Sequence, residues 1–174
     1  MIKVIALDFD GVIMDSVYEI FVICKKLLEE KGLQVNVYDI DRFRSGRNFL
    51  RSGSSLYGII EFFKQGRDFD RVTQEEIDNF VNEHEEESKK FSDEFFAVRR
   101  RLQDENLENW FSLLNLFPGI KKAIERLSER FHIVIMSTRD FYSISAVFKK
   151  NGIKINDDNI ISKETYRERT YPAS

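Results

Sequence analysis

The sequence predicts an α/β fold, a parallel-sheet core interrupted by an all-helical insertion, from three observations. A short apolar run at residues 3–8 has the length and composition of a buried strand and ends in an acidic turn. A second such run occupies residues 132–136. Roughly a hundred mostly helical residues separate the two, although a parallel crossover needs only about a dozen. The predicted core comprises residues 1–15 and 117–174, and the predicted insertion comprises residues 16–116.

Apolar residues at helical spacing predict the helices of the insertion. Asp15 or Ser16 can cap the first helix, which Gly32 ends. Thr73 followed by Glu76 is typical of a capping box at the start of a long, charged helix. His84 lies in the charge run of that helix, and we expect it to be solvent exposed. This long helix is expected at about 74–104, and the remaining helices of the insertion at about 39–50, 55–64 and 107–116.

Pro118-Gly119 marks the return of the chain to the core. An amphipathic helix is expected at residues 120–130, before the strand at 132–136. A second helix follows from about 142 to 151 and stops at Gly152. Ile160-Ile161 predicts a third short strand. The core sequence therefore alternates strands and helices, which favours a parallel sheet.

The composition excludes several classes of protein. The 174 residues include 16 Phe and 42% hydrophobic residues, enough for a real core. The net charge of −3 gives no indication of a nucleic-acid or membrane partner. No apolar run approaches the roughly 18 residues of a membrane span, and no signal peptide precedes the first strand. The single cysteine, Cys24, lies among apolar residues and predicts a buried thiol in a reducing, cytoplasmic environment.

Asp8, Asp10 and Gly11 carry most of the functional information. Ligand sites of parallel sheets form at the carboxyl ends of strands, which is where Asp8 and Asp10 lie. Two carboxylates this close repel each other unless a cation or a proton lies between them. Gly11 lets the backbone turn sharply beside a ligand. The simpler interpretation is a strand that ends in an acidic turn.

The segment Asp8-Phe9-Asp10-Gly11-Val12, with Asp15-Ser16 after it, resembles the signature of the haloacid dehalogenase-like superfamily. The resemblance implies a three-layer, Rossmann-like sheet with a helical cap inserted after the motif. It implies that Asp8 is the nucleophile that forms an aspartyl-phosphate and that Asp10 is the general acid/base. It further implies a Mg²⁺ site with Asp8 and Asp10 as ligands. The presence of Asp10 argues against the dehalogenase branch of the superfamily, which lacks that residue.

The other motifs of the superfamily are matched less completely. A hydroxyl at the end of the second core strand binds the phosphoryl group in members of the superfamily, and Ser137 fits that place, with Thr138 as the alternative. Lys163 is the best-placed match to the lysine of the third motif. Asp157-Asp158 precede the third strand instead of ending it, so the acidic pair of the fourth motif has no counterpart.

Three strands are fewer than the five or more of the superfamily core. The first strand would then lie at an exposed edge, and apolar edges are normally covered. We therefore expect either that the chain is a truncated form with its C-terminal strands missing or that another chain, as in a homo-oligomer, covers this edge.

The leading functional hypothesis is a Mg²⁺-dependent phosphatase that acts on a small phosphorylated metabolite. The alternatives are a phosphomutase of the same superfamily, or a catalytically weak, truncated member with a binding or regulatory role. Arg47 is our candidate for recognition of a second anionic group, because arginine matches carboxylate and phosphate oxygens. It belongs to a cluster with Arg42, Arg44 and Arg51, which could equally be a basic solvated face.

Overall fold

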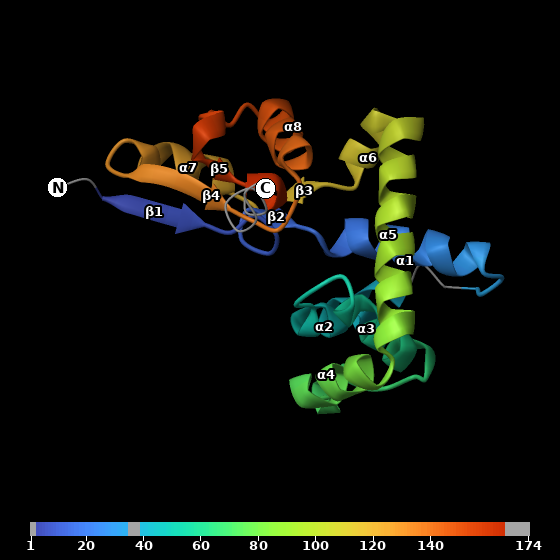
Figure 1. Ribbon diagram of the computed structural model, residues 1–174. Coiled ribbons are helices and arrows are strands. Elements are labelled where there is room, and N and C mark those ends of the chain that lie inside the picture. The colour runs from blue at the N-terminus through green and yellow to red at the C-terminus, as the bar shows by residue number, and fades with distance from the viewer. Residues whose placement is uncertain (1–2, 35–38, 166–174) are drawn as a thin grey trace, which may run out of the picture. The chain divides into compact units, whose positions relative to one another are not determined.

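A parallel three-stranded sheet forms the centre of the core. The computed structural model describes residues 3–34 and 39–165. The sheet has the order β1–β4–β5, with β4 in the middle, and both pairings are parallel (Figure 1). Its strands are β1 (Val4–Leu7), β4 (His132–Met136) and β5 (Ile160–Ile161). The predicted α/β architecture with a parallel sheet is confirmed.

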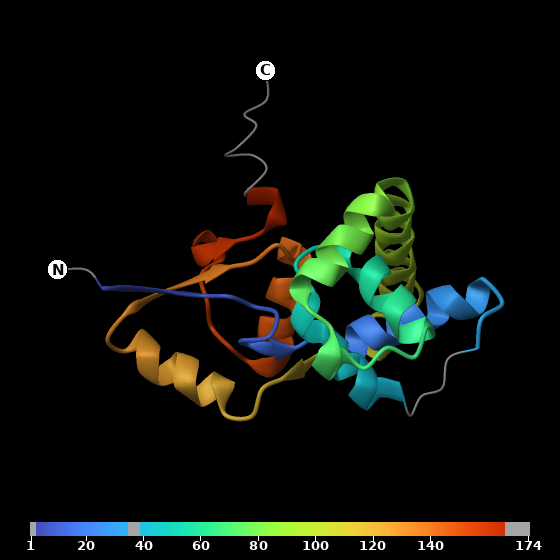
Figure 2. The same ribbon diagram turned by 90° about the horizontal axis from the view of Figure 1, so that it is seen from below.

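Alternation along the strands separates the two faces of this sheet. Ile133 and Ile135 of β4 are buried, and Ile5 and Leu7 of β1 lie opposite them in register. Helix α7 runs along one side of the sheet (Figure 2). The helical elements of the core are α7 (Ile120–Ser128), α8 (Phe141–Asn151) and the 3-10 turn η4 (Asp157–Asn159). Because one set of alternate residues is buried, the register of the strands is strongly specified.

A two-stranded antiparallel ribbon lies where the chain leaves and re-enters the core. It consists of β2 (Met14–Asp15) and β3 (Asn115–Leu116). The backbone N–H of Phe117 extends it by donating to the carbonyl of Ile13 at 3.1 Å. The ribbon therefore holds together two positions about a hundred residues apart in the sequence, and the inserted helices begin and end beside it.

The described chain divides into two compact units, Met1–Ser16 with Leu114–Ser174 and, between them, Val17–Leu113. We call these the core unit and the helical unit. The α-helices of the helical unit are α1 (Val17–Glu30), α2 (Ile40–Gly46), α3 (Ser55–Lys64), α4 (Gln74–Glu83), α5 (Glu85–Glu105) and α6 (Leu107–Ser112). Its 3-10 turns are η2 (Arg47–Phe49) and η3 (Phe69–Arg71).

Aromatic side chains fill the interior of the helical unit. Phe43 packs against Phe21 at a ring-centroid distance of 5.4 Å and against Phe63 at 6.4 Å. The long helix α5 packs on α1 and α3. Cys24 is buried, as predicted, and burial raises the pKa of its thiol far above the usual value. This thiol is therefore inert packing material rather than a nucleophile.

The predicted long helix from Gln74 to Asp104 is in fact two helices, which meet at His84. The predicted exposure of His84 is wrong. Its ring is half-buried, stacks on Phe80 at 4.2 Å and places Nδ1 2.9 Å from the Phe80 carbonyl oxygen. The backbone of His84, at φ −124° and ψ 47°, leaves the helical region and ends α4.

Candidate functional site

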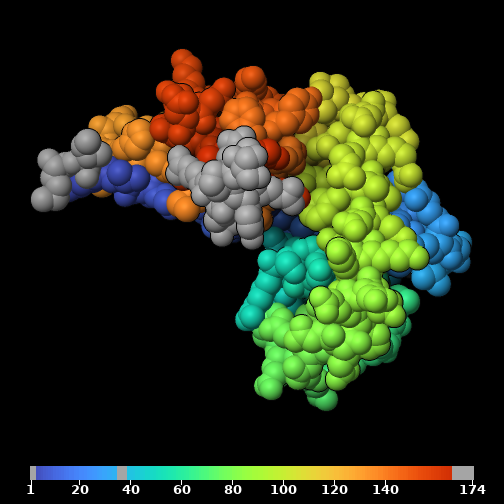
Figure 3. Space-filling model, viewed as in Figure 1, coloured from blue at the N-terminus to red at the C-terminus, as the bar shows by residue number. Residues whose placement is uncertain are grey.

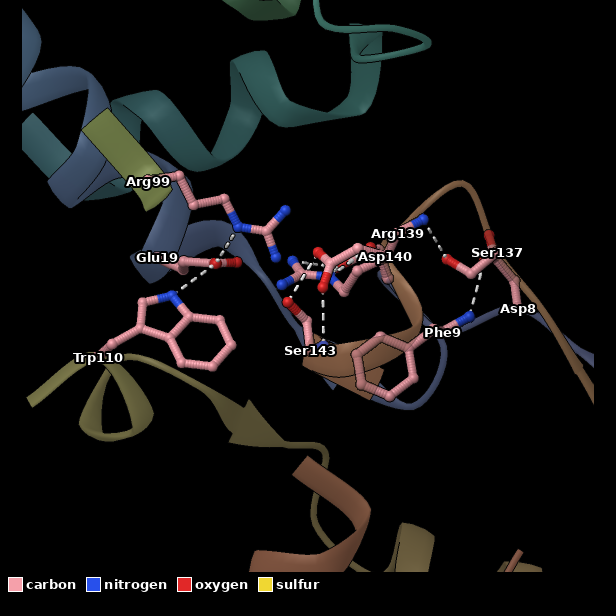
Figure 4. Close-up of polar contacts among 10 residues, drawn as sticks. Asp8, Phe9, Glu19, Arg99, Trp110, Ser137, Arg139, Asp140 and Ser143 are labelled. Atoms are coloured by element: carbon pink, nitrogen blue, oxygen red, sulfur yellow. Dashed lines mark hydrogen bonds and ion pairs between the residues drawn. The ribbon is translucent and has the colours of Figure 1, made fainter. Parts of the chain in front are cut away.

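The ends of β1 and β4 bring the predicted site residues of the core together. Leu7 lies opposite Ile135 in the parallel ladder, so the residues that follow each strand leave the same edge of the sheet. Asp8 follows the end of β1, and Ser137 follows the end of β4 (Figure 4). Asp10 comes two residues after Asp8. This is the edge at which parallel α/β sheets bind ligands.

Phe9 orients the two carboxylates. Its ring is fully buried and meets Phe148 edge-on at 5.5 Å. Asp8, on one side of it, is exposed, and Asp10, on the other side, is half-buried. Asp8 Oδ1 accepts a hydrogen bond from the Phe9 N–H at 2.6 Å. An anchored Phe9 thus fixes the turn while its neighbours stay accessible.

Gly11 makes the turn after β1 possible. Its φ of 84° lies in the region that favours glycine. Its N–H donates to the Met14 carbonyl at 2.8 Å, and the N–H groups of Ile13 and Met14 both donate to the Phe9 carbonyl. The turn is therefore closed by its own backbone hydrogen bonds, and a side chain at position 11 would strain it.

The turn after β4 is equally well defined. The Ser137 N–H donates to the Ile161 carbonyl at 2.9 Å, and its Oγ accepts from the Arg139 N–H at 3.2 Å. Thr138 is exposed. Asp140 caps α8 by accepting from the N–H and the hydroxyl of Ser143 at 2.8 and 2.7 Å. Asp140 is therefore the N-cap of α8, which begins at Phe141, four residues after Ser137.

Arg139 is a site residue that the sequence analysis did not single out. Its guanidinium binds the Asp10 carboxylate, with Nη2 2.7 Å from Oδ1 and Nε 3.0 Å from Oδ2 (Figure 4). The Arg139 side chain is only 4% exposed. A buried arginine needs a counter-ion, and Asp10 is that partner. The signal in the sequence was a basic residue two places after the candidate phosphate-binding hydroxyl.

The remaining candidates lie in different places. The Lys163 N–H donates to the Arg139 carbonyl at 3.1 Å, so the backbone of Lys163 borders the site. Asp157 and Asp158 precede β5 in η4, which places them at the opposite end of that strand. Arg47 belongs to the helical unit, in η2.

The arginine cluster of the helical unit is partly committed to internal contacts. Arg42 Nη2 donates to the Phe63 carbonyl oxygen at 2.5 Å, and its guanidinium carbon lies 4.5 Å from the centroid of the Phe63 ring. Arg51 pairs with Asp78 at 3.1 Å. These two arginines therefore have structural partners within the helical unit.

The donor set at the strand ends is suited to a hard divalent cation. Carboxylate and carbonyl oxygens are the ligands that Mg²⁺ prefers, and it usually keeps several water molecules. Asp8, directly after β1, is exposed, and Asp10 follows it two residues later with both a carboxylate and a main-chain oxygen to offer. Across residues 3–34 and 39–165, no group of three or more His, Cys, Asp or Glu side chains is arranged to hold a metal. The residues present thus fit a cation held by few protein ligands.

A buried charged network in the helical unit was also missed by the sequence analysis. Glu19 is 1% exposed, and its Oε1 accepts from Arg99 Nε at 3.0 Å and from Trp110 Nε1 at 3.2 Å (Figure 4). Trp110 is also buried. The signal for Glu19 was one acid within the otherwise apolar or aromatic run of residues 17–24.

Comparison with known proteins agrees with this geometry. The family model described as haloacid dehalogenase-like hydrolase matches residues 2–168. The chain belongs to this family. The resemblance stated on the Asp8-Phe9-Asp10-Gly11 motif is therefore confirmed, and the family is one of hydrolases. No match was found among proteins with curated descriptions.

Solved structures show the same fold as this haloacid dehalogenase-like chain. A hydrolase of subfamily IA, variant 1, of the same superfamily from Geobacter sulfurreducens matches with 15% identity and a TM-score of 0.51. A predicted phosphoglycolate phosphatase from Haemophilus somnus matches with 15% identity and a TM-score of 0.54. Each alignment covers 94% of this chain and 64% of the other, so the chain spans less than two thirds of their length. In the described residues, no helix is both long and apolar enough to span a membrane.

Proposed function

We propose that this chain carries the active site of a Mg²⁺-dependent phosphatase that hydrolyses a small phosphorylated metabolite. The observation that supports the proposal best is the convergence of Asp8, Asp10 and Ser137 at the adjoining ends of two parallel strands. The match to a hydrolase family and the fold shared with a predicted phosphoglycolate phosphatase agree with it.

Each residue has a defined role in the proposed reaction. An Asp8 carboxylate oxygen attacks phosphorus, the bond to the leaving oxygen breaks, and Asp10 gives that oxygen a proton. Asp10 then takes a proton from water as the water attacks the aspartyl-phosphate, which releases phosphate and restores Asp8. The Ser137 hydroxyl, together with Thr138, Gly11 and Lys163, would bind phosphoryl oxygens. A Mg²⁺ held by the Asp8 side chain and the Asp10 main-chain oxygen would supply charge neutralisation.

Replacement of the nucleophile tests the proposal. Asp8→Asn keeps the size of the side chain and removes its negative charge, so it should abolish Mg²⁺-dependent hydrolysis of an aryl phosphate. Asp157→Asn is the matched control, since Asp157 is exposed at the other end of β5. Full activity in the Asp8 variant would overturn the assignment.

The metal requirement separates an enzyme from a catalytically weak, binding or regulatory member. The second hypothesis is favoured by one observation: within residues 3–34 and 39–165, no group of three or more His, Cys, Asp or Glu side chains is arranged to hold a metal. Turnover that is lost with a chelator and restored by Mg²⁺ favours the enzyme. Mg²⁺ binding without turnover, or neither of them, favours the weak member.

We assign Arg47 to substrate recognition in a cap formed by the helical unit. Its guanidinium would bind a second anionic group of the substrate, which makes Arg47→Ala lose selectivity between anionic and neutral phosphoesters. Arg71→Ala is a suitable control, since the Arg71 side chain is 87% exposed. Equal selectivity in the wild type and the Arg47 variant would remove this assignment.

The proposal includes a cytoplasmic location, based on the single cysteine, and a further partner for β1. That partner is either additional strands of a longer chain or a second copy of this chain. Light scattering of the purified chain distinguishes the two, because only the second copy doubles the mass.

A further inference from the structure

We propose that Arg139 is a positioning residue for Asp10, and that it links Asp10 to Ser137. The inference rests on the proposed phosphatase function, in which these two residues handle the proton and the phosphoryl group. It comes from the contacts of Arg139 on both its side chain and its backbone, which no sequence motif specified.

The side chain of Arg139 binds both carboxylate oxygens of Asp10. Nη2 lies 2.7 Å from Oδ1, and Nε lies 3.0 Å from Oδ2 and 3.2 Å from Oδ1. Two parallel N–H···O contacts fix both the distance and the plane of a carboxylate. A lysine in the same place would supply the charge without the fork. Arg139 therefore determines the orientation of Asp10, not only its charge balance.

The side chains of Arg139 and Asp10 differ in exposure, and this difference indicates that Arg139 is the fixed partner. The Arg139 side chain is 4% exposed, whereas that of Asp10 is 22% exposed. The guanidinium carbon lies 5.8 Å from the centroid of the buried Phe9 ring. Arg139 is thus embedded in the core unit, and the Asp10 carboxylate is presented by it at the accessible edge of the sheet.

The backbone of Arg139 orients the second group. Its N–H donates to Ser137 Oγ at 3.2 Å, and its carbonyl accepts from the Lys163 N–H at 3.1 Å. A hydroxyl oxygen that accepts a hydrogen bond still has its own proton to donate. The Ser137 hydroxyl can therefore donate to a phosphoryl oxygen while its position is fixed by Arg139.

These contacts predict an effect on turnover rather than on substrate binding. Asp10 must face the leaving oxygen to give it a proton, and it must then face the water to take a proton when the water attacks the Asp8-phosphate. An Asp10 without Arg139 samples other rotamers and meets both groups less often, so both steps slow. Loss of an interaction needed only in the transition state lowers kcat and kcat/KM together.

The decisive comparison is Arg139→Gln against Arg139→Lys in the full chain, assayed with an aryl phosphate and Mg²⁺. We expect kcat of the glutamine variant to fall about tenfold or more with KM little changed, and the lysine variant to recover part of the loss. Arg126→Gln, on the outer part of α7, is the matched control. A kcat within about twofold of the wild type, or a higher KM with kcat unchanged, would overturn the proposal.

A stability measurement tests the pair independently of catalysis. Urea unfolding of Arg139→Gln, Asp10→Asn and the double variant forms a thermodynamic cycle. We expect the double variant to be clearly more stable than the sum of the single changes implies, since each single change leaves a partner behind. Additive changes would overturn the proposed pairing. Absence of turnover in the wild type would instead reject the phosphatase function, so the two failures are distinguishable.

Discussion

Glu19 is a buried acidic residue, only 1% exposed, and its burial bears directly on stability. It lies on the inner face of α1 beside Ile20 and Ile23, where a charge without partners would be costly. Arg99 and Trp110 supply the donors that satisfy it. Since these partners come from α5 and α6, the network joins the first helix of the helical unit to its last two.

Removal of the Glu19 carboxylate should destabilise the helical unit strongly. In Glu19→Ala, a buried Arg99 loses an acidic partner, and breaking such a pair costs about 3–5 kcal/mol. Trp110 is the only tryptophan, so its fluorescence during urea unfolding reports the change directly.

The control is Glu30→Ala on the same helix, which removes an exposed pair with Arg101. Exposed pairs contribute about 0–1 kcal/mol, so this variant should unfold near the wild-type midpoint. Equal effects of the two substitutions would show that the burial of Glu19 does not determine its contribution.

The site residues differ in how far the sequence could predict them. Asp8, Asp10 and Gly11 lie within four positions of one another, so a short sequence motif was enough to predict them. Ser137 followed from the resemblance to the superfamily, whose members carry a phosphate-binding hydroxyl at the end of the second core strand. The Arg139–Asp10 contact joins residues 129 positions apart, and no local pattern encodes which side chain an arginine will meet. Contacts of this kind depend on the packed geometry of the sheet.

Among the helices, α4 has the most completely defined start. Thr73 Oγ1 accepts from the Glu76 N–H at 3.2 Å, and the Glu76 carboxylate accepts from the Thr73 N–H at 2.8 Å. The predicted capping box is confirmed. Thr73→Ala should lower the free energy of unfolding by about 1 kcal/mol, because it leaves a helix-terminal N–H without its acceptor. Urea unfolding measures this, and Thr73→Ser should restore it.

Glu76 makes this helix start sensitive to acid. Its hydrogen bond from the Thr73 backbone N–H, and then that from Arg67, lower its pKa below the ordinary value of 4.5. Because the folded state takes up the proton at lower pH than the unfolded state, the stabilisation is present above about pH 4.5 and is lost as the pH falls through the lowered pKa. Glu76→Gln should therefore be less stable than the wild type at neutral pH, with the difference shrinking in acid.

The neighbouring Glu75→Gln is the control for this pH dependence. Glu75 lies in the same first turn of α4 and is exposed. Unfolding midpoints from pH 7 down to about pH 3 should converge for Glu76→Gln and the wild type. A constant difference over that range would contradict the role of the Glu76 carboxylate.

Element boundaries were predictable where a local signal ends them and not elsewhere. Gly152, at φ 62°, ends α8 as predicted. No glycine or proline marks the helix break at His84 in the sequence. The break is stabilised by stacking of the His84 ring on Phe80. The β2–β3 ribbon was also missed, since two-residue strands have no periodicity to detect. Tertiary contacts decide such features, and propensity does not.

At the scale of the whole molecule, the accessible edge of β1 is the feature that bears most directly on assembly. In the part of the chain that the structure describes, β1 pairs with β4 on one side only. Its atoms, dark blue in Figure 3, are exposed at the rim of the core unit. Val4 is 56% exposed and Met136 of the neighbouring strand is 49% exposed. An apolar edge with unpaired backbone groups is a template for pairing with another strand.

The purified chain should therefore associate with itself as its concentration rises, and a charge on β1 should weaken that association. Val4→Lys places an ammonium group on the edge strand, where natural sheets use lysine to prevent pairing. Tyr142→Lys is the matched control, because Tyr142 is equally exposed, at 57%, but lies on α8. Light scattering over a concentration series should show a lower mass for the Val4 variant alone. Equal masses for both variants would locate any association elsewhere, and a monomeric wild type at every concentration would show that the β1 edge does not pair with itself.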